Sequence, residues 1–133
     1  MAEMNDSFNE VTAEMLKVIS DYDSVTGFQG AYNIRQDSMC AGRKNSENIT
    51  IESKTDKPGI NIRVKPGTKG ETVYIPACVT HSNVDDLVYN DFFIGEGADV
   101  TIVAGCGVHS DGSETARHNG IHRFFLELSL IHI

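Results

Sequence analysis

The chain has 133 residues, a length typical of one domain, and hydrophobic residues make up 40% of it, enough to build a core. Its 19 acidic and 11 basic residues give a net charge of −8, which argues against nucleic acid or an anionic membrane as the main partner. No stretch approaches the roughly 18 apolar residues of a transmembrane helix. The acidic N-terminus lacks the features of a secretory signal, and three widely spaced cysteines fit a reducing compartment. We therefore expect a cytoplasmic protein.

Residues 7–23 are predicted to form one amphipathic helix. Ser7 and Glu10 have the spacing of a capping box, in which each side chain satisfies a backbone N–H of the first turn. The apolar side chains recur at spacings of three and four and so share one face: Phe8, Val11, Met15, Val18, Ile19 and Tyr22. Residues 1–30 are thus interpreted as an N-terminal helix and linker, with the helix packed on the rest of the domain; a partner-binding helix is the alternative.

Residues 31–127 are predicted to be an all-β body. Ile60, Ile62 and Val64 alternate with polar residues, the period of a half-buried strand. Seven strand-like runs follow one another, separated by turn signals and with no helical pattern between them: Ala31–Arg35, Asn48–Glu52, Ile60–Lys65, Thr72–Thr80, Leu87–Ile94, Asp99–Ala104 and Gly120–Glu127.

A weak internal repeat suggests how these strands are arranged. The run Asp91–Ile94 is similar to Thr72–Ile75, and His122–Leu126 is similar to both, at separations of 19 and 32 residues. A β-solenoid with one enlarged rung would produce such a repeat. A β-sandwich would also contain short strands of this kind, so both architectures remain open from the periodicity.

The last six residues, 128–133, read LSLIHI and look like the translated end of a sequencing-library adapter. The preceding strand stops without a turn or cap, which favours this interpretation over a genuine apolar strand. On this interpretation the chain is an N-terminal fragment of a longer protein.

One long stretch carries a family resemblance. From Leu87 to His122 the chain reads LVYNDFFIGEGADVTIVAGCGVHSDGSETARHNGIH. Together with KTDKPG at 54–59 and VKPGT at 64–68, this stretch closely resembles the SufB/SufD family of iron–sulfur cluster assembly proteins, and most of all its short SufB-like members. The resemblance covers about residues 28–127.

The resemblance implies a right-handed parallel β-helix (solenoid) preceded by one N-terminal α-helix. It also implies a scaffold that works with a SufC-like ABC ATPase and with a SufB/SufD-like partner or a second copy of itself. An iron–sulfur cluster would be assembled there transiently. The best-established cluster residues of the family lie beyond residue 127, so we expect this fragment to hold no cluster.

Four potential metal ligands lie within seventeen residues: Cys106, His109, His118 and His122. Thiolate and imidazole suit zinc, iron and copper(I), although the spacing C-x2-H-x8-H-x3-H matches no standard zinc module. Cys106 follows the strand Val100–Ala104 and is a candidate contact for a cluster or a persulfide. We expect the three histidines on the loop that follows, folded back toward Cys106 as metal ligands. The alternative is that the loop is a hydrogen-bonded turn without metal.

Other motifs point away from catalysis by the chain itself. It contains neither a phosphate-binding P-loop nor a G-x-S-x-G nucleophile elbow, so we do not expect an enzyme. The carboxylates of Asp85 and Asp86 are interpreted as a solvated turn. Two functions compete with the scaffold: a small β-fold metal-binding protein or metalloenzyme that uses Cys106, His109, His118 and His122, and a purely structural solenoid.

Overall fold

The computed structural model describes residues 30–81, 84–108 and 116–127, and this part of the chain is mainly β-strand and contains no helix. The strands, in chain order, are β1 (Ala31–Gln36), β2 (Met39–Lys44), β3 (Ile49–Ser53), β4 (Gly59–Val64), β5 (Lys69–Val79), β6 (Asp85–Ile94), β7 (Asp99–Val108) and β8 (Arg117–Leu126).

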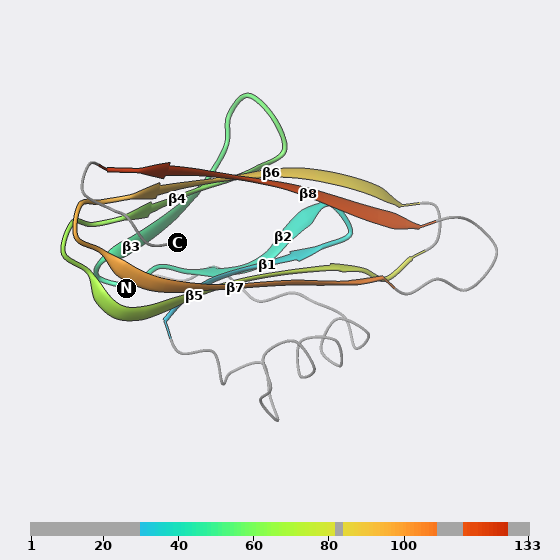
Figure 1. Cartoon of the computed structure of the whole chain (residues 1–133). Helices are drawn as coiled ribbons and strands as arrows, with labels where there is room; N and C mark the ends of the chain where they lie inside the picture. The colour runs from blue at the N-terminus through green and yellow to red at the C-terminus, as the bar shows by residue number, and fades with distance from the viewer. Residues whose placement is uncertain (1–29, 82–83, 109–115, 128–133) are drawn as a thin grey trace.

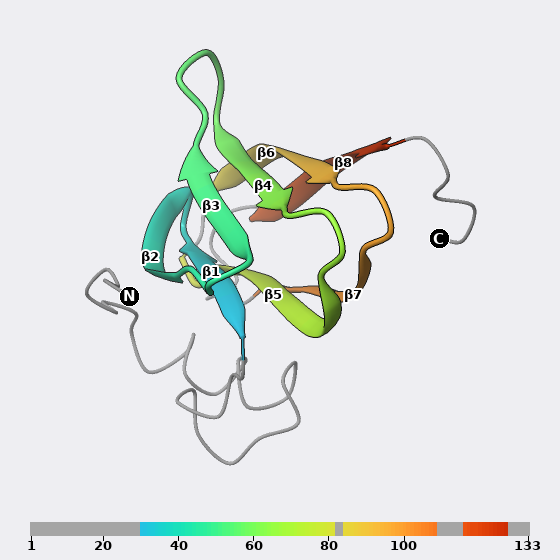
Figure 2. The same ribbon diagram turned by 90° about the vertical axis from the view of Figure 1, so that its left-hand side faces the viewer.

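The strands form two four-stranded sheets that face each other (Figure 1). One sheet has the order β2-β1-β5-β7 and the other the order β3-β4-β6-β8. Each sheet is mixed, because β1–β2 and β3–β4 are antiparallel pairs and every other pairing is parallel. From β5 onward the chain alternates between the sheets, and the links from β4 to β5 and from β6 to β7 lie at the same end (Figure 2).

The prediction of a parallel β-helix is therefore wrong. Both sheets are mixed, since an antiparallel hairpin occupies one side of each, and the described residues form two facing sheets rather than a solenoid. The described part of the chain also contains no helix. The predicted helix over residues 7–23 and the proposed adapter sequence over 128–133 lie outside the described residues.

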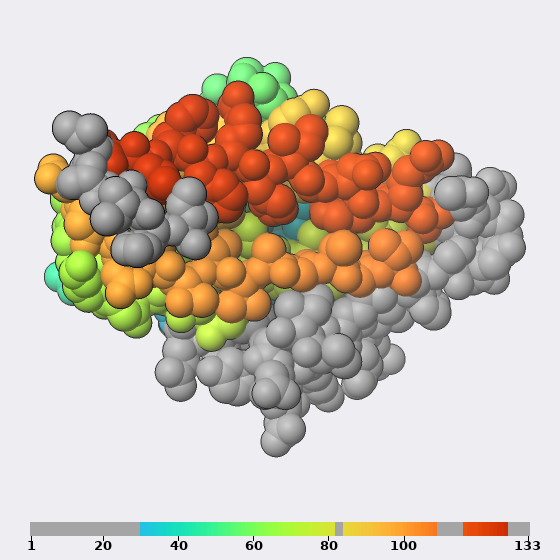
Figure 3. All heavy atoms as spheres, in the orientation of Figure 1, coloured from blue at the N-terminus to red at the C-terminus, as the bar shows by residue number. Residues whose placement is uncertain are grey.

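The hydrophobic core lies between the sheets. Alternate residues of each strand point inward, so Ile62 of β4, Val73 of β5 and Phe92 of β6 are almost completely buried. The core becomes thinner toward β7 and β8, where Ile102 is only partly buried and Phe124 is 45% exposed. Figure 3 shows a hollow between β7 (orange) and β8 (red), through which atoms of earlier strands are visible.

Candidate functional site

His118, Gly120 and His122 occupy alternate positions of β8 and therefore lie on one face of the strand. Their register partners on β6 are Asp86, Val88 and Asn90, all of which are buried. The face that carries the two histidines is thus the inner one, which looks toward the other sheet. This corrects the expectation of a loop: His118 and His122 both lie on a regular strand.

The His118 ring is oriented by a buried carboxylate. Its Nδ1 lies 2.8 Å from Oδ2 of Asp86, whose side chain is 1% exposed. Arg35 of β1, in the facing sheet, holds the same carboxylate through Nε and Nη2, with distances between 2.8 and 3.1 Å. Burial alone would raise the pKa of Asp86, but the hydrogen bonds from His118 and Arg35 outweigh it and hold that pKa well below its usual range.

This arrangement determines which nitrogen of His118 is available to a ligand. A neutral imidazole that donates its Nδ1–H to a carboxylate carries its lone pair on Nε2. Asp86 therefore selects the tautomer of His118 in which Nε2 can bind a metal ion, and it also restrains the rotation of the ring. This is the usual environment of a metal-ligating histidine.

His122 provides a second imidazole close to the first. Partial burial and the nearby charge of His118 both lower the pKa of His122, so its neutral form is favoured near pH 7. Its ring centroid lies 6.1 Å from that of Phe92, which limits the space on the core side. Within the described parts of the chain, neither ring nitrogen of His122 has a hydrogen-bond partner.

Gly120 is the reason that the two rings can approach each other. A Cβ atom built on Gly120 would lie 3.3 Å from Nε2 of His122 and 3.5 Å from Nε2 of His118. The backbone of Gly120 does not lie in the left-handed region. Its missing side chain therefore matters because it leaves space for the two rings, not because it permits an unusual backbone conformation. Both Nε2 atoms therefore lie over the same point of β8.

The other predicted ligands are not brought into this arrangement. Cys106 lies within β7, paired with Ala77 of β5, and its residue is exposed. His109 lies outside the described residues. Among residues 30–81, 84–108 and 116–127, no group of three or more His, Cys, Asp or Glu side chains has an arrangement that could hold a metal ion. The structure thus joins His118 to His122, but it does not add Cys106 to them.

The sequence interpretation missed Asp86 and Arg35. The sequence interpretation places Asp86 in a solvated turn with Asp85, yet Asp86 is the first buried residue of β6. A signal was present, because Asp86 is in phase with the apolar positions Val88 and Phe92. Extending that alternation backward by one step would have placed the carboxylate inside.

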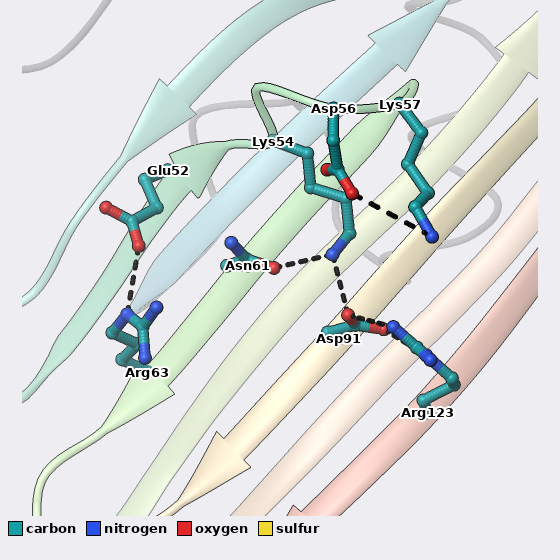
Figure 4. Close-up of polar contacts among 8 residues, drawn as sticks. All are labelled: Glu52, Lys54, Asp56, Lys57, Asn61, Arg63, Asp91 and Arg123. Atoms are coloured by element: carbon teal, nitrogen blue, oxygen red, sulfur yellow. Dashed lines mark hydrogen bonds and ion pairs between the residues drawn. The ribbon is translucent and has the colours of Figure 1, made fainter.

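A second ionic cluster lies on the outer face of the β4-β6-β8 region (Figure 4). The amine of Lys54 lies 2.6 Å from Asp91 and 2.8 Å from Oδ1 of Asn61, while Arg123 of β8 donates two hydrogen bonds to Asp91. The hydrogen bond from Arg123 is the largest influence on the pKa of Asp91 and lowers it; Lys54 adds to this effect, and together they outweigh burial. Lys54 and Arg123 both contact the same carboxylate, so we interpret this cluster as structural.

Comparisons with known proteins give no relative for the chain: no family model, no curated protein and no solved structure matches it. The resemblance to SufB/SufD proteins therefore depends on the quoted motifs alone.

A search of the described residues for a helix long and apolar enough to cross a membrane finds none.

Proposed function

We propose that this chain belongs to a scaffold component of a SUF-type iron–sulfur cluster assembly system that works with a SufC-like ABC ATPase. The stretch Leu87–His122, which carries the resemblance, runs through β6, β7 and the first half of β8. On β7 and β8 it places the exposed thiol of Cys106 and the imidazoles of His118 and His122. That placement of soft and borderline ligands on two strands beside a hollow is the observation that carries the proposal.

The chemistry of these groups suits an assembly step. Iron and sulfide are the substrates, and a cysteine thiolate can bind the iron directly. Cys106 differs in this respect from Cys78, which is buried in β5. In this proposal Cys106 is the first contact for iron or for the cluster, and a SufB/SufD-like partner or a second copy of the chain supplies the remaining ligands.

The test uses the protein expressed from its complete reading frame, with the SufC-like ATPase present. Anaerobic incubation with ferrous iron and sulfide should produce visible absorbance together with bound iron and sulfide. Cys106→Ser should lower all three at least several-fold. Cys40→Ser is the matched control, because Cys40 is also exposed but lies on β2, in the antiparallel hairpin.

Two outcomes would contradict the scaffold role. One is a protein that neither associates with the ATPase in size-exclusion chromatography nor acquires iron and sulfide. The other is equal cluster content in wild type, Cys106→Ser and Cys40→Ser.

A metal-binding protein outside any SUF system is the second candidate. The convergence of His118 and His122 over Gly120 favours it, because that geometry needs neither sulfide nor a partner. Metal binding without association with an ATPase and without sulfide uptake would distinguish it from the scaffold.

A further inference from the structure

We propose that Nε2 of His118 and Nε2 of His122 together bind one divalent transition-metal ion over Gly120, on the inner face of β8. The site follows from geometry alone and does not depend on the scaffold role. If the proposed scaffold function is correct, the natural ion is iron(II), and only this identification rests on the proposed function.

The first argument is convergence. Residues four apart on a strand are about 13 Å apart along the backbone, so two such side chains normally do not share a ligand. Here both imidazoles lean toward the residue between them, and both Nε2 atoms lie within 3.5 Å of the position that a Cβ of Gly120 would occupy. The missing side chain of Gly120 therefore leaves space next to both Nε2 atoms.

The second argument is orientation of the ligands. Asp86 holds Nδ1 of His118 at 2.8 Å, and Arg35 fixes Asp86 from the facing sheet. A carboxylate behind a histidine fixes the tautomer and raises the basicity of the nitrogen that meets the metal. His118 thus has the support that a metal-ligating histidine usually has, while His122 has no hydrogen-bond partner among the described residues.

The third argument concerns access and exchange. Figure 3 shows a hollow between β7 and β8 on this side of the molecule. Residue His122 is exposed. Two protein nitrogens leave at least two positions of a tetrahedral ion for water or another ligand. Such a site suits an ion that is taken up and passed on, rather than one that holds the fold together.

Imidazole ligands define the class of ion. They suit Zn²⁺, Fe²⁺, Ni²⁺ and Cu²⁺, and they disfavour Mg²⁺ and Ca²⁺, which prefer oxygen. Asp86 does not face the ion directly in this proposal; it acts through His118 and is a positioning residue.

The test is calorimetric titration of the 133-residue chain with Zn²⁺, followed by anaerobic titration with Fe²⁺, both without sulfide or ATPase. The background variant is His109→Ala/His132→Ala without a histidine tag, so that the histidines outside the described residues contribute nothing. We expect one ion per chain and at least tenfold weaker binding in His122→Ala.

Gly120→Ala provides a second, independent variant. It adds a methyl group within 3.5 Å of both Nε2 atoms while keeping both histidines, so binding should weaken by a similar factor. The controls are His81→Ala, whose ring is on the surface, and Cys40→Ser, which changes an exposed thiol on β2; both should bind within twofold of the background. Circular dichroism establishes that each variant is folded.

The proposal is overturned if the background variant binds no ion, or if His122→Ala and Gly120→Ala bind as tightly as it does. It is also overturned if Cys106→Ser abolishes binding while His122→Ala retains it. Because sulfide and ATPase are absent, failure here leaves the scaffold test unaffected, and failure of cluster assembly leaves this one unaffected.

Discussion

Asp86 and His118 are register partners on β6 and β8, and a carboxylate oxygen of Asp86 lies 2.8 Å from Nδ1 of His118. The guanidinium of Arg35 binds the same carboxylate from the opposite sheet. One buried charge therefore connects β1, β6 and β8, and it links the candidate metal site to the packing of the two sheets.

Replacing this carboxylate should destabilise the fold. In Asp86→Asn the charge of Arg35 stays largely buried but loses its counter-ion, and breaking a buried pair in this way costs about 3–5 kcal/mol. Urea denaturation should show that loss of unfolding free energy. Asp56→Asn is the control, because its carboxylate is exposed and pairs loosely with Lys57; it should change stability by less than about 0.5 kcal/mol. Equal effects would contradict the role given to Asp86.

Stability should decrease in acid. The pKa values of Asp86 and Asp91 are lower in the folded protein than the value of about 3.9 of an unfolded chain. A depressed folded pKa contributes stability that is complete above the unfolded value and is lost as the pH falls toward the folded value. The free energy of unfolding should therefore decline below about pH 4, as measured by urea denaturation at successive pH values.

Asp91→Asn gives the matching check. This variant should show a shallower decline between about pH 4 and pH 2, since one of the two depressed carboxylates is gone. A decline as steep as that of the wild type would show that Asp91 does not contribute.

The two cations of the outer ionic cluster should differ in their effects. Lys54 is 6% exposed and Arg123 is 50% exposed, although both contact Asp91. Lys54→Ala removes a buried partner and should cost about 3–5 kcal/mol. Arg123→Ala breaks a surface pair, which contributes about 0–1 kcal/mol. Thermal or urea denaturation of both variants tests this order, and a larger loss in Arg123→Ala would contradict it.

Two aromatic stacks should also differ. Phe92 stacks on Phe124 at 4.7 Å on the inner face, and Phe93 stacks on Phe125 at 4.9 Å on the outer face. Phe92 is fully buried, so Phe92→Ala should cost about 3–5 kcal/mol. Phe125 is 45% exposed, and Phe125→Ala should cost about 0.5–1.5 kcal/mol. Comparable losses in urea denaturation would mean that the inner face is not the core.

The sequence repeat predicted part of the sheet pairing. The similarity at 32 residues corresponds to direct partners, since Phe92 pairs with Phe124 and Phe93 with Phe125. The similarity at 19 residues does not, because Thr72–Ile75 lies in β5, in the opposite sheet. Alternation of apolar residues records which face is buried, and strands of both sheets share that pattern. It therefore cannot show which strand is the neighbour.

The hairpins that make the sheets mixed were harder to predict. β2 contains Cys40, Ala41 and Gly42, with no apolar alternation, and it was not predicted as a strand. The turn before it has positive φ at Asp37 and Ser38, without the glycine that usually marks such a turn. Asp37 is instead held by hydrogen bonds to the backbone N–H and the hydroxyl of Thr80, a partner distant in sequence. Such tertiary support has no local signature.

The candidate site was predicted only in part. His118 and His122 are named from their residue types, and from the sequence we expect them on a loop. Their actual proximity depends on strand geometry, on Gly120 and on the register that places Asp86 behind His118. The first two are local, but the register is a tertiary property that spacing alone does not reveal.

The alternation of the chain between the two sheets also affects the order of folding. Each of the last three strands pairs in parallel with a strand that precedes it in the chain by roughly thirty residues. During synthesis on a ribosome, β6, β7 and β8 would each pair with a strand that has already been synthesised. The domain can therefore fold progressively from its N-terminal hairpins, because none of these three strands depends on a partner later in the sequence. The inner face of β8 would then be assembled last, after the strands that support it have folded.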